Sequence, residues 1–396
     1  MPHAPIKSLA IITSQALSLK NFRGPLIRDI VDRGIHCYAL APDYNDRLYR
    51  EIESLGAAPV DISLRRTSIT PLRDIQDLFS LSHVLRDLKP DATLTYFIKP
   101  VIYGTLAAKL AGIPRCYSII EGAGYVFSVS NHNTTLKFRF LRRAIRFLYK
   151  VSLRLADKVF FLNPDDLHLF VNEMKILPAG RTISIPGIGV DLREYSRQPP
   201  VKSPVTFILI ARLLVQKGIR EFVQAARILA RDQHQVRFLL LGDVDDNPDS
   251  LSYEEIHSWV DEGLIEWPGH VDDVRPWLAQ SSVVVLPSTY REGLPRSLME
   301  GMAMGRPIIT TDAPGCRDTV MEGINGYLVP PRNVEALAAA MLEFIKRPEL
   351  IEKMGEESRM LAEQRFDVIG INRKILHSMG IQADSRQDPG DCSEGI

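Results

Sequence analysis

The sequence predicts an α/β protein built from two doubly wound parallel sheets, and three observations lead to this fold class. Short apolar runs alternate with helical patterns in both halves of the 396 residues, as in parallel sheets covered by helices on both faces. The alternation stops at a polar, proline-rich stretch, residues 198–204, and then begins again. A hydrophobic content of 45% over this length allows more than one core. We therefore expect two Rossmann-like domains facing across a cleft, with ligands beyond the carboxyl ends of the strands.

The individual elements follow from the period of the apolar residues. Short apolar runs predict buried strands, and apolar residues at every third or fourth position predict helices. In the first half the expected strands are 9–13, 35–41, 91–97, 115–120 and 158–162, and the expected helices are 25–32, 72–88, 101–111 and 136–156. In the second half the expected strands are 205–210, 236–241, 282–286 and 307–310, and the expected helices are 218–230, 253–262, 295–304 and 334–345.

The domain boundaries are placed where the composition changes. Residues 1–197 form the first expected domain and residues 198–365 the second. A helix over 366–380 follows, which could cross back to the first domain. Residues 381–396 are polar and are expected to be disordered.

Charge and cysteine content narrow the class of protein. Lysine plus arginine equals aspartate plus glutamate at 48 each, but residues 1–200 carry 27 basic and 18 acidic side chains and the remainder carries 21 and 30. A basic first domain is therefore expected to meet an anionic partner. The four cysteines show no Cys-x-x-Cys spacing, which argues against a zinc ribbon or a disulfide framework and favours the reducing cytoplasm. No apolar stretch approaches the ~20 residues that span a bilayer, so any membrane contact is expected to be peripheral.

Two glutamates eight positions apart form the most informative motif. Gly293 permits a tight turn and Pro295 suits the first position of a helix, so Glu292 falls in a loop and Glu300 inside the helix. The two carboxylates are then at most about 12 Å apart along the helix axis. Free amides between them make an anion site flanked by two hydroxyl acceptors, which suits a nucleotide-sugar. The alternative is that Glu292 only complements the helix dipole and Glu300 is solvated.

Two cations follow the first strand of the second half. Arg212 and Lys217 lie five positions apart, between an apolar run and a helix. An arginine fork and a mobile lysine charge can neutralise a departing diphosphate, whereas the alternative is two solvated surface cations. The Asp-x-Asp element at 243–245 follows a strand and is interpreted as a solvated turn, not as a metal site.

The stretch 122–156 contains no acidic residue and seven basic ones interleaved with apolar residues. A basic amphipathic helix of this kind lies on anionic lipid. The alternatives are a sheet-covering helix with a solvated basic face and a nucleic-acid groove, for which no binding module is present. The stretch opens with Gly122-Ala-Gly124, which lacks the third glycine of a dinucleotide fingerprint, so a nicotinamide enzyme is not expected. The residues assigned to membrane or acceptor contact are Lys137, Arg139, Arg142, Arg143, Arg146 and Lys150.

Four motifs together carry a family resemblance. They are Arg212 with Lys217, the stretch 269–275 (Gly-His-Val-Asp-Asp-Val-Arg), the Arg-Glu-Gly-Leu-Pro element at 291–295, and the stretch 325–330 (Asn-Gly-Tyr-Leu-Val-Pro). The combination resembles the retaining glycosyltransferases of family 4, which have the GT-B fold, over nearly the whole chain. The resemblance implies a UDP-sugar donor whose diphosphate is held by Arg212 and Lys217, with no metal and no cofactor.

The same resemblance implies roles for the residues around the two glutamates. Glu300 would bind the ribose hydroxyls of the donor. Glu292, with the amides of Gly293 and Leu294, would bind the transferred sugar and the phosphate nearest to it. The backbone near His270 and Val271 would contact the nucleotide base of the donor.

Within that family the first domain resembles the bacterial subgroup that extends lipid-linked oligosaccharides, including transferases that add N-acetylgalactosamine to undecaprenyl diphosphate-linked sugars. The segments that carry this resemblance are 19–28, 98–104, 120–127 and 162–166.

Two residues of these segments have an expected role. Gly24 would let the backbone approach the donor phosphates, and a helix beginning at Pro25 would point its dipole at them. Many relatives have a histidine where this chain has Glu121, so Glu121 is the competing candidate for a catalytic base. Its apolar neighbours could raise its pKa.

These features predict a retaining transferase of a hexose or N-acetylhexosamine, with N-acetylgalactosamine as first choice, acting on a polyprenyl diphosphate-linked sugar. Retention without a nucleophile implies front-face attack, with the catalytic candidates Arg212, Lys217, Glu292 and Glu121. The expected partners are the UDP-sugar, the lipid-linked acceptor and an anionic membrane at the cytoplasmic face of the inner membrane, and no nucleic acid. The alternatives are a transferase with a soluble acceptor, a nucleotide-sugar epimerase, and a nucleotide-sugar-binding scaffold.

Overall fold

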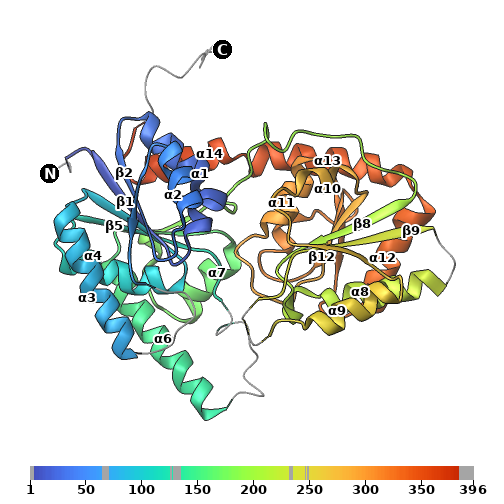
Figure 1. The fold of residues 1–396 in the computed structure, drawn as a ribbon, viewed down its shortest axis with the longest axis horizontal. Helices are drawn as coiled ribbons and strands as arrows, with labels where there is room; N and C mark the ends of the chain where they lie inside the picture. Colours follow the sequence, from blue (N-terminus) through green and yellow to red (C-terminus); the bar gives the residue numbers. More distant parts are fainter. Residues whose placement is uncertain are drawn as a thin grey trace. The chain divides into compact units, whose positions relative to one another are not determined.

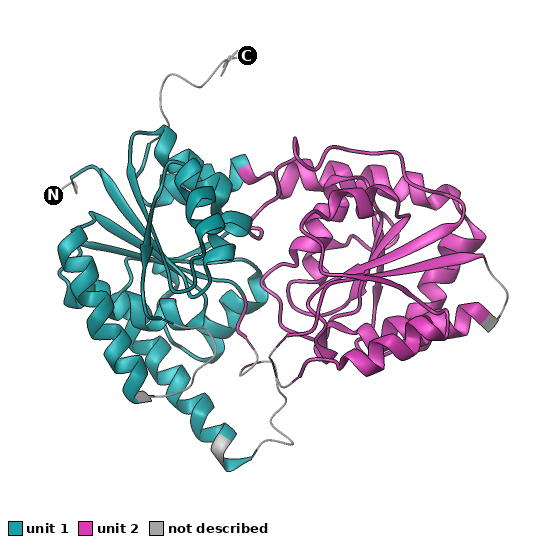
Figure 2. Cartoon of the chain, in the orientation of Figure 1, with its two compact units in different colours: residues 1–121, 132–185, 369–396 teal, residues 122–131, 186–368 magenta. Residues whose placement is uncertain are grey.

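The chain folds into two compact α/β units (Figures 1 and 2). Unit 1 comprises residues 1–121, 132–185 and 369–396, and unit 2 comprises residues 122–131 and 186–368. Each unit is a parallel sheet flanked by helices, so the expected fold class is confirmed. The computed structural model describes residues 4–64, 71–124, 127, 135–231, 235–245, 247 and 249–382. The tail at 383–396, for which disorder was expected, lies outside this range.

The described part of unit 1 contains a seven-stranded sheet in the order β3-β2-β1-β4-β5-β6-β7. The winding direction reverses between β1 and β4, and every paired strand is parallel. The two central strands β4 and β5 are buried along their whole length, as expected for a sheet covered on both faces. The strands are β1 (Ser8–Ile12), β2 (His36–Ala41), β3 (Ala58–Asp61), β4 (Ala92–Tyr96), β5 (Arg115–Ile120), β6 (Lys158–Phe161) and β7 (Thr182–Ser184).

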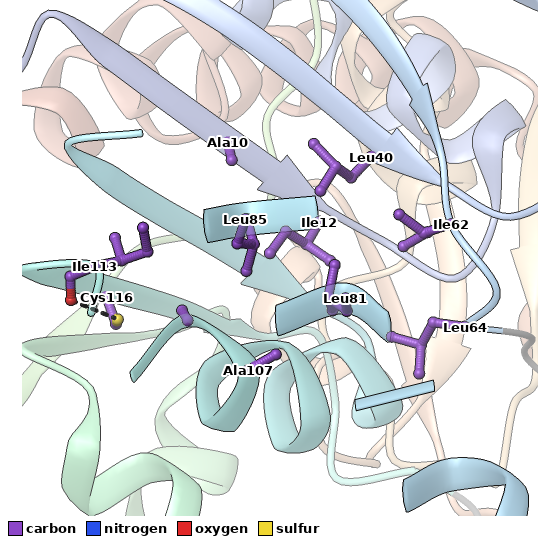
Figure 3. Packing of buried hydrophobic residues seen from close by; sticks show 11 residues of the cluster. Ala10, Ile12, Leu40, Ile62, Leu64, Leu81, Leu85, Ala107, Ile113 and Cys116 are labelled. Atoms are coloured by element: carbon purple, nitrogen blue, oxygen red, sulfur yellow. Dashed lines mark hydrogen bonds between the residues drawn. The ribbon is translucent and has the colours of Figure 1, made fainter. Parts of the chain in front are cut away.

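Helices cover this sheet and close its core. Figure 3 shows Ile12 and Leu40 from the strands meeting Leu81 and Leu85 from a covering helix, with all four side chains at most 2% exposed. The α-helices are α1 (Ala16–Asp32), α2 (Asp46–Ser54), α3 (Pro71–Leu88), α4 (Thr105–Leu110), α6 (Leu136–Leu155) and α7 (Pro164–His168). Irregular helical turns are η1 (Pro100–Gly104), η3 (Leu169–Glu173) and η4 (Ala179–Arg181).

Helix α1 begins earlier than the sequence suggested. It spans Ala16–Asp32, so Gly24 and Pro25 lie in its interior and no helix starts at Pro25. Apolar residues of α1 are buried on both sides of the proline, and this packing outweighs the local cost of proline in a helix. The expected Gly24 loop and the dipole at Pro25 are therefore wrong. A methyl group at Gly24 would meet only Leu55 Cδ1, at 3.9 Å.

Unit 2 begins before the expected linker. Its main segment starts at Pro186 and takes in the proline-rich stretch 198–204. Arg306 is fully buried and its Nη1 donates to the carbonyl of Gln198 at 2.7 Å. This bond fastens the stretch to unit 2, and the pattern of prolines alone could not reveal it.

The end of the chain packs on unit 1. Helix α14 (Val368–Ser378) belongs to unit 1 from Ile369 onward. Asn372 Nδ2 donates to Asp29 Oδ2 at 2.9 Å, which joins α14 to α1.

The described part of unit 2 contains a six-stranded parallel sheet in the order β10-β9-β8-β11-β12-β13. This is the strand order of a doubly wound sheet, with its reversal between β8 and β11. The strands are β8 (Val205–Ile210), β9 (Val236–Leu241), β10 (Glu266–Gly269), β11 (Val283–Leu286), β12 (Ile308–Thr311) and β13 (Gly326–Val329). The helices are η5 (Val215–Lys217), α8 (Ile219–Arg231), α9 (Tyr253–Asp261), α10 (Arg275–Ala279), α11 (Arg296–Ala303), η6 (Arg317–Thr319), α12 (Val334–Lys346) and α13 (Glu349–Arg365).

The described cysteines are expected to be unreactive in the folded protein. Cys37, Cys116 and Cys316 are free and buried, and burial raises the pKa of Cys37 and of Cys316 to about 12. At pH 8 only about one thiol in ten thousand would then be a thiolate. A chromogenic disulfide reagent at pH 8 should therefore leave all three unmodified until guanidinium is added. Rapid modification of Cys37, Cys116 or Cys316 in the folded Cys392→Ala variant would contradict this burial.

Candidate functional site

The loops that follow the strands at the reversal of unit 2 carry the residues predicted to bind the donor. In doubly wound sheets, ligands bind beyond the carboxyl ends of the strands at this reversal. Arg212 and Lys217 follow β8, and Glu292 follows β11. β8 and β11 are direct neighbours in the sheet, which brings the two loops together.

The loop after β8 lies directly on the loop after β11. Its short helix η5 ends at Gly218, which has a φ of 75°. A Cβ at this position would lie 2.2 Å from the carbonyl oxygen of Pro287. The amide of Thr289 donates to the carbonyl of Gln216 at 2.8 Å. Glycine is therefore required at 218, because the two loop backbones touch there.

Lys217 and Glu292 form an ion pair in this contact. Lys217 Nζ lies 2.5 Å from Glu292 Oε1, and Ser288 Oγ donates to the same oxygen at 2.9 Å. The side chains of Lys217 and Glu292 are only 15% and 11% exposed. The two residues assigned to diphosphate and sugar are thus adjacent, and their charges offset each other.

Two glycines let other backbone segments approach the Glu292 loop. Gly315 follows β12 with a φ of 79°, and a Cβ there would lie 2.4 Å from the carbonyl oxygen of Glu292. Gly122 has a φ of 109°, and a Cβ there would lie 3.0 Å from the amide nitrogen of Gly293. The Gly122-Ala-Gly124 stretch that resembled part of a dinucleotide fingerprint therefore packs on the Glu292 loop in unit 2.

Glu300 lies inside α11, as the sequence predicted, and is 6% exposed. Its Oε1 accepts from the hydroxyl of Tyr195 at 2.8 Å and from Arg296 Nε at 2.6 Å. Burial raises the pKa of the Tyr195 phenol, which therefore stays a donor at neutral pH. Within the described residues Oε2 has no hydrogen-bond partner. The carboxylate is thus buried and oriented through one oxygen, so the solvated alternative for Glu300 is wrong.

Arg212 is held by a residue that the sequence had assigned to a solvated turn. Its Nη1 lies 2.6 Å from Asp245 Oδ2, and its side chain remains 46% exposed. The turn itself exists, because Asp245 Oδ1 accepts from the amide of Asn247 at 3.1 Å. Asp245 is part of the Asp-x-Asp element, and in this structure that carboxylate contacts a cation of the candidate site.

The segment expected to meet the base lies at the end of β10. His270 is exposed and its Nε2 lies 3.8 Å from Asp272 Oδ1, while Val271 is half-buried. The carbonyl of Gly269 accepts from the amide of Gly242 at 3.0 Å, which ties this segment to the end of β9. The segment thus occupies the same carboxyl edge of the unit 2 sheet as Arg212.

Unit 1 has a polar cluster at its own reversal, between β1 and β4. Glu121 directly follows β5, and its carboxylate forms an ion pair with Arg23 of α1. The Arg23 side chain is 2% exposed, and its guanidinium carbon lies 4.7 Å from the ring centre of Tyr96. Tyr96 OH hydrogen-bonds Ser18 Oγ at 2.8 Å. Burial raises the pKa of the Glu121 carboxyl, as its apolar neighbours suggested, and the Arg23 guanidinium opposes that rise.

Several residues of these two clusters were missed in the sequence. Arg296 could have been found, because it precedes Glu300 by four positions and such pairs meet on a helix. Tyr195 and Arg23 carry no comparable signal, since their contacts depend on how distant segments pack. Ser288 precedes Glu292 by four positions but lies in a loop, where that spacing alone does not predict a contact.

The basic segment expected at a membrane forms α6. Its exposed apolar residues Leu136, Phe140 and Phe147 recur at helical spacing along one stripe, with exposures of 80%, 76% and 64%. A neighbouring stripe, one position earlier, carries exposed cations. They are Arg139, Arg143, Arg146 and Lys150. Among the described helices none is long and apolar enough to cross a membrane. The side chain of Lys137 lies outside the described residues.

Family comparisons match both halves of the chain. Residues 22–163 match the family described as glycosyl transferase 4-like, and residues 204–347 match the family described as glycosyl transferases group 1.

Two relatives that match over most of their length are named as transferases that act on lipid-linked sugars. The chain is 27% identical over 344 residues to the N,N'-diacetylbacillosaminyl-diphospho-undecaprenol alpha-1,3-N-acetylgalactosaminyltransferase of Campylobacter jejuni, with 83% of this chain and 87% of that protein covered. It is 23% identical over 374 residues to the UDP-Gal:alpha-D-GlcNAc-diphosphoundecaprenol alpha-1,3-galactosyltransferase of Escherichia coli, with 90% of each chain covered.

Solved structures share the fold. HepE of Anabaena in complex with UDP and glucose superposes with a TM-score of 0.74 at 17% identity, covering 95% of this chain and 100% of that one. Sucrose-phosphate synthase from Thermosynechococcus elongatus superposes with a TM-score of 0.76 at 18% identity, covering 94% of this chain and 98% of that one. With its two parallel-sheet units and its two matching domain families, the chain is a family 4 glycosyltransferase with the GT-B fold.

Proposed function

We propose that this glycosyltransferase moves a hexose or N-acetylhexosamine, with N-acetylgalactosamine as first choice, from a UDP-sugar to a polyprenyl diphosphate-linked sugar with retention. The observation that carries the proposal is the pair of buried carboxylates, Glu292 and Glu300, each oriented by hydrogen bonds at the carboxyl edge of the unit 2 sheet. Two such carboxylates suit a ligand with hydroxyls at both ends. The names of the Campylobacter and Escherichia relatives support a diphosphate-linked lipid acceptor in cell-surface polysaccharide or glycan assembly.

The donor would bind through charged groups that form ion pairs with one another in this structure. Lys217 would turn from Glu292 toward the diphosphate, and Glu292 would then accept hydroxyls of the transferred sugar. The backbone amides of Gly293 and Leu294, before α11, would take the phosphate nearest that sugar. Arg212 would add a second cation, exchanging the Asp245 carboxylate for a phosphate oxygen. Glu300 Oε2 would accept from the ribose.

Front-face transfer accounts for retention without a covalent intermediate. The bond between the anomeric carbon and the leaving phosphate oxygen breaks while the acceptor hydroxyl oxygen bonds to the same face of that carbon. The hydroxyl proton passes to the leaving phosphate oxygen, and UDP leaves. Arg212 and Lys217 stabilise the negative charge that develops on the phosphate. We propose that this step needs neither metal nor cofactor.

A donor screen tests the whole proposal. UDP release would be measured with a panel of UDP-sugars and a short-chain polyprenyl diphosphate sugar as acceptor, and the product linkage determined by NMR. The expected result is acceptor-dependent release from one donor and an axial linkage retained from it. Inverted linkage would overturn the mechanism, turnover with soluble sugars alone would overturn the acceptor, and sugar isomerisation without transfer would identify an epimerase. UDP binding without any turnover would identify a scaffold.

We also propose that α6 places unit 1 on the anionic cytoplasmic face of the inner membrane. An apolar stripe beside a basic stripe is the arrangement of helices that lie in a membrane interface. Helix α3 adds a second apolar stripe, Leu72, Ile75 and Phe79, with exposures of 80%, 50% and 53%. Both helices pack against η1 within unit 1 and run along the same margin of it in Figure 1.

Replacing Arg143 and Lys150 with Gln is expected to weaken binding to phosphatidylglycerol-rich vesicles about 30-fold, since each cation near such a surface contributes about 1 kcal/mol. Neither side chain has a hydrogen-bond or ion-pair partner within the described residues, so the fold should be unaffected. Sedimentation with vesicles at low and high salt would measure the loss, which should shrink as salt rises.

The matched control removes the same charge from unit 2. Lys346→Gln with Lys353→Gln changes two exposed lysines on α12 and α13 and should leave vesicle binding unchanged. Equal losses in both variants would show that only net charge matters and would contradict a specific α6 surface. Phe140→Ser with Phe147→Ser should remove the salt-resistant part of the binding.

A further inference from the structure

The ion pair between Arg23 and Glu121 has features that a structural pair does not require. It joins the helix after β1 to the residue after β5, beside the reversal of the unit 1 sheet between β1 and β4, where doubly wound sheets bind ligands. The residue after β4, Phe97, has a φ of 69°, a strained conformation for a bulky residue that is typical of functional sites. Phe97 also packs edge-on against Phe22, the neighbour of Arg23, with ring centres 6.4 Å apart.

The two oxygens of Glu121 differ in their surroundings. Oε1 accepts from Arg23 Nη2. Within the described residues Oε2 has no hydrogen-bond partner, and the side chain is 10% exposed. The carboxylate is thus fixed through one oxygen, and the other remains available to a hydroxyl from outside.

Arg23 has a second contact besides its ion pair with Glu121. Its guanidinium stacks on Tyr96, and its Nε is buried without a hydrogen-bond partner among the described residues. An unpaired buried donor costs free energy, so the position is maintained against a local penalty. The titratable and charged groups that face Glu121 are Arg23 on α1 and, behind it, Tyr96 on β4.

We propose that Arg23 is the positioning residue of a hydroxyl-binding site in unit 1, in which Glu121 Oε2 accepts a hydrogen bond from a hydroxyl of the acceptor sugar. This rests on the proposed transferase function and adds the acceptor side to it. Arg23 opposes the rise in the Glu121 pKa that burial causes, and it orients the carboxylate through Oε1. A neutral or rotated Glu121 would lose the acceptor hydroxyl but leave the UDP-sugar unaffected.

Kinetics of four variants test the dependence of one residue on the other. Glu121→Gln should lower kcat/KM for the lipid-linked acceptor at least about 10-fold, because a hydrogen bond to a charged group is lost. Arg23→Gln should lower it similarly, and Arg23→Lys should restore part of the loss. The double variant Arg23→Gln with Glu121→Gln should be no slower than Glu121→Gln alone. Losses that multiply in the double variant would overturn the proposal.

Two controls separate positioning from folding. Arg28→Gln removes an exposed cation from the same helix and should leave acceptor kinetics unchanged. The double variant buries no unpaired charge and should fold even where Arg23→Gln does not. UDP affinity should be equal in all variants, and a loss of UDP binding in Arg23→Gln would overturn the acceptor-side assignment.

A titration that needs no turnover distinguishes this proposal from the transferase function. Carboxyl ¹³C NMR of protein labelled at glutamate, assigned with Glu121→Gln, would follow Glu121 against pH. Arg23→Gln should move its midpoint to higher pH, and Arg23→Lys should move it less. An unchanged midpoint would overturn the role of Arg23, whereas a shifted midpoint in an enzyme that releases no UDP from any donor would overturn the transferase function instead.

Discussion

Replacing Arg212 and Lys217 together with alanine is expected to lower transfer by about a thousandfold or more, because both cations offset charge that develops on the leaving phosphate. Lys217 is expected to be the larger contributor, since its 2.5 Å pair with Glu292 fixes it in a largely buried position. Arg212 is half exposed and its pair with Asp245 is open to solvent, so its single replacement should cost less. Single-turnover rates at saturating UDP-sugar would measure the loss in the chemical step.

Loss of Lys217 alone also affects stability, and the design must separate the two effects. Removing one partner of a buried pair leaves the Glu292 carboxylate uncompensated, at a cost of about 3 kcal/mol. Lys217→Met with Glu292→Gln removes both charges and should recover most of that stability without recovering transfer. Arg220→Ala with Arg227→Ala provides the matched control, because these cations of α8 pair with glutamates at the surface. Near-normal turnover in Lys217→Met with Glu292→Gln would contradict the diphosphate role of Lys217.

The positions of Glu292, Glu300 and Lys217 could be predicted because they depend on local sequence and on the order of the strands. Gly293 and the proline after it place Glu292 in a loop and Glu300 in a helix, and the structure has both there. Lys217 and Glu292 meet because β8 and β11 are neighbours, which the alternating pattern already implies for a doubly wound sheet.

The missed strands were short, and two of them contain proline. β3 reads Ala-Pro-Val-Asp and β10 reads Glu-Trp-Pro-Gly, both at sheet edges, where proline is tolerated because one side of the strand needs no donor. Neither has the apolar run that marks a buried strand. Tertiary pairing with a neighbouring strand forms them, and the local pattern does not encode it.

The error at α1 has the opposite cause. Gly24-Pro25 is a strong local signal for a break, but the helix continues through it because its apolar stripe is buried against the sheet on both sides. Because the helix continues, Arg23 contacts Glu121, and this neighbour of Gly24 belongs to the polar cluster of unit 1. The local glycine and proline signals could not show this contact, since Glu121 lies 98 positions from Arg23 in the sequence.

Glu300→Ala is expected to weaken UDP binding about 100-fold, because hydrogen bonds from ribose hydroxyls to a buried carboxylate contribute about 3 kcal/mol together. Tyr195→Phe should weaken it less, since Arg296 still holds Oε1 at 2.6 Å. Calorimetry with UDP measures both effects. Glu349→Ala, at an exposed glutamate of α13, serves as the control and should bind UDP normally.

If Glu300 binds the ribose, its replacement should also change how the protein distinguishes UDP from a deoxynucleotide. Wild-type protein should bind 2'-deoxyuridine diphosphate more weakly than UDP, because one hydroxyl donor is missing. Glu300→Ala has no carboxylate to receive that hydroxyl, so the difference between the two nucleotides should nearly vanish. If Glu300→Ala weakened both nucleotides and kept their difference, the carboxylate would act by holding Tyr195 and Arg296 in place and the hydroxyl would be bound elsewhere. The two nucleotides therefore distinguish a ligand contact from a role in packing at the same buried residue.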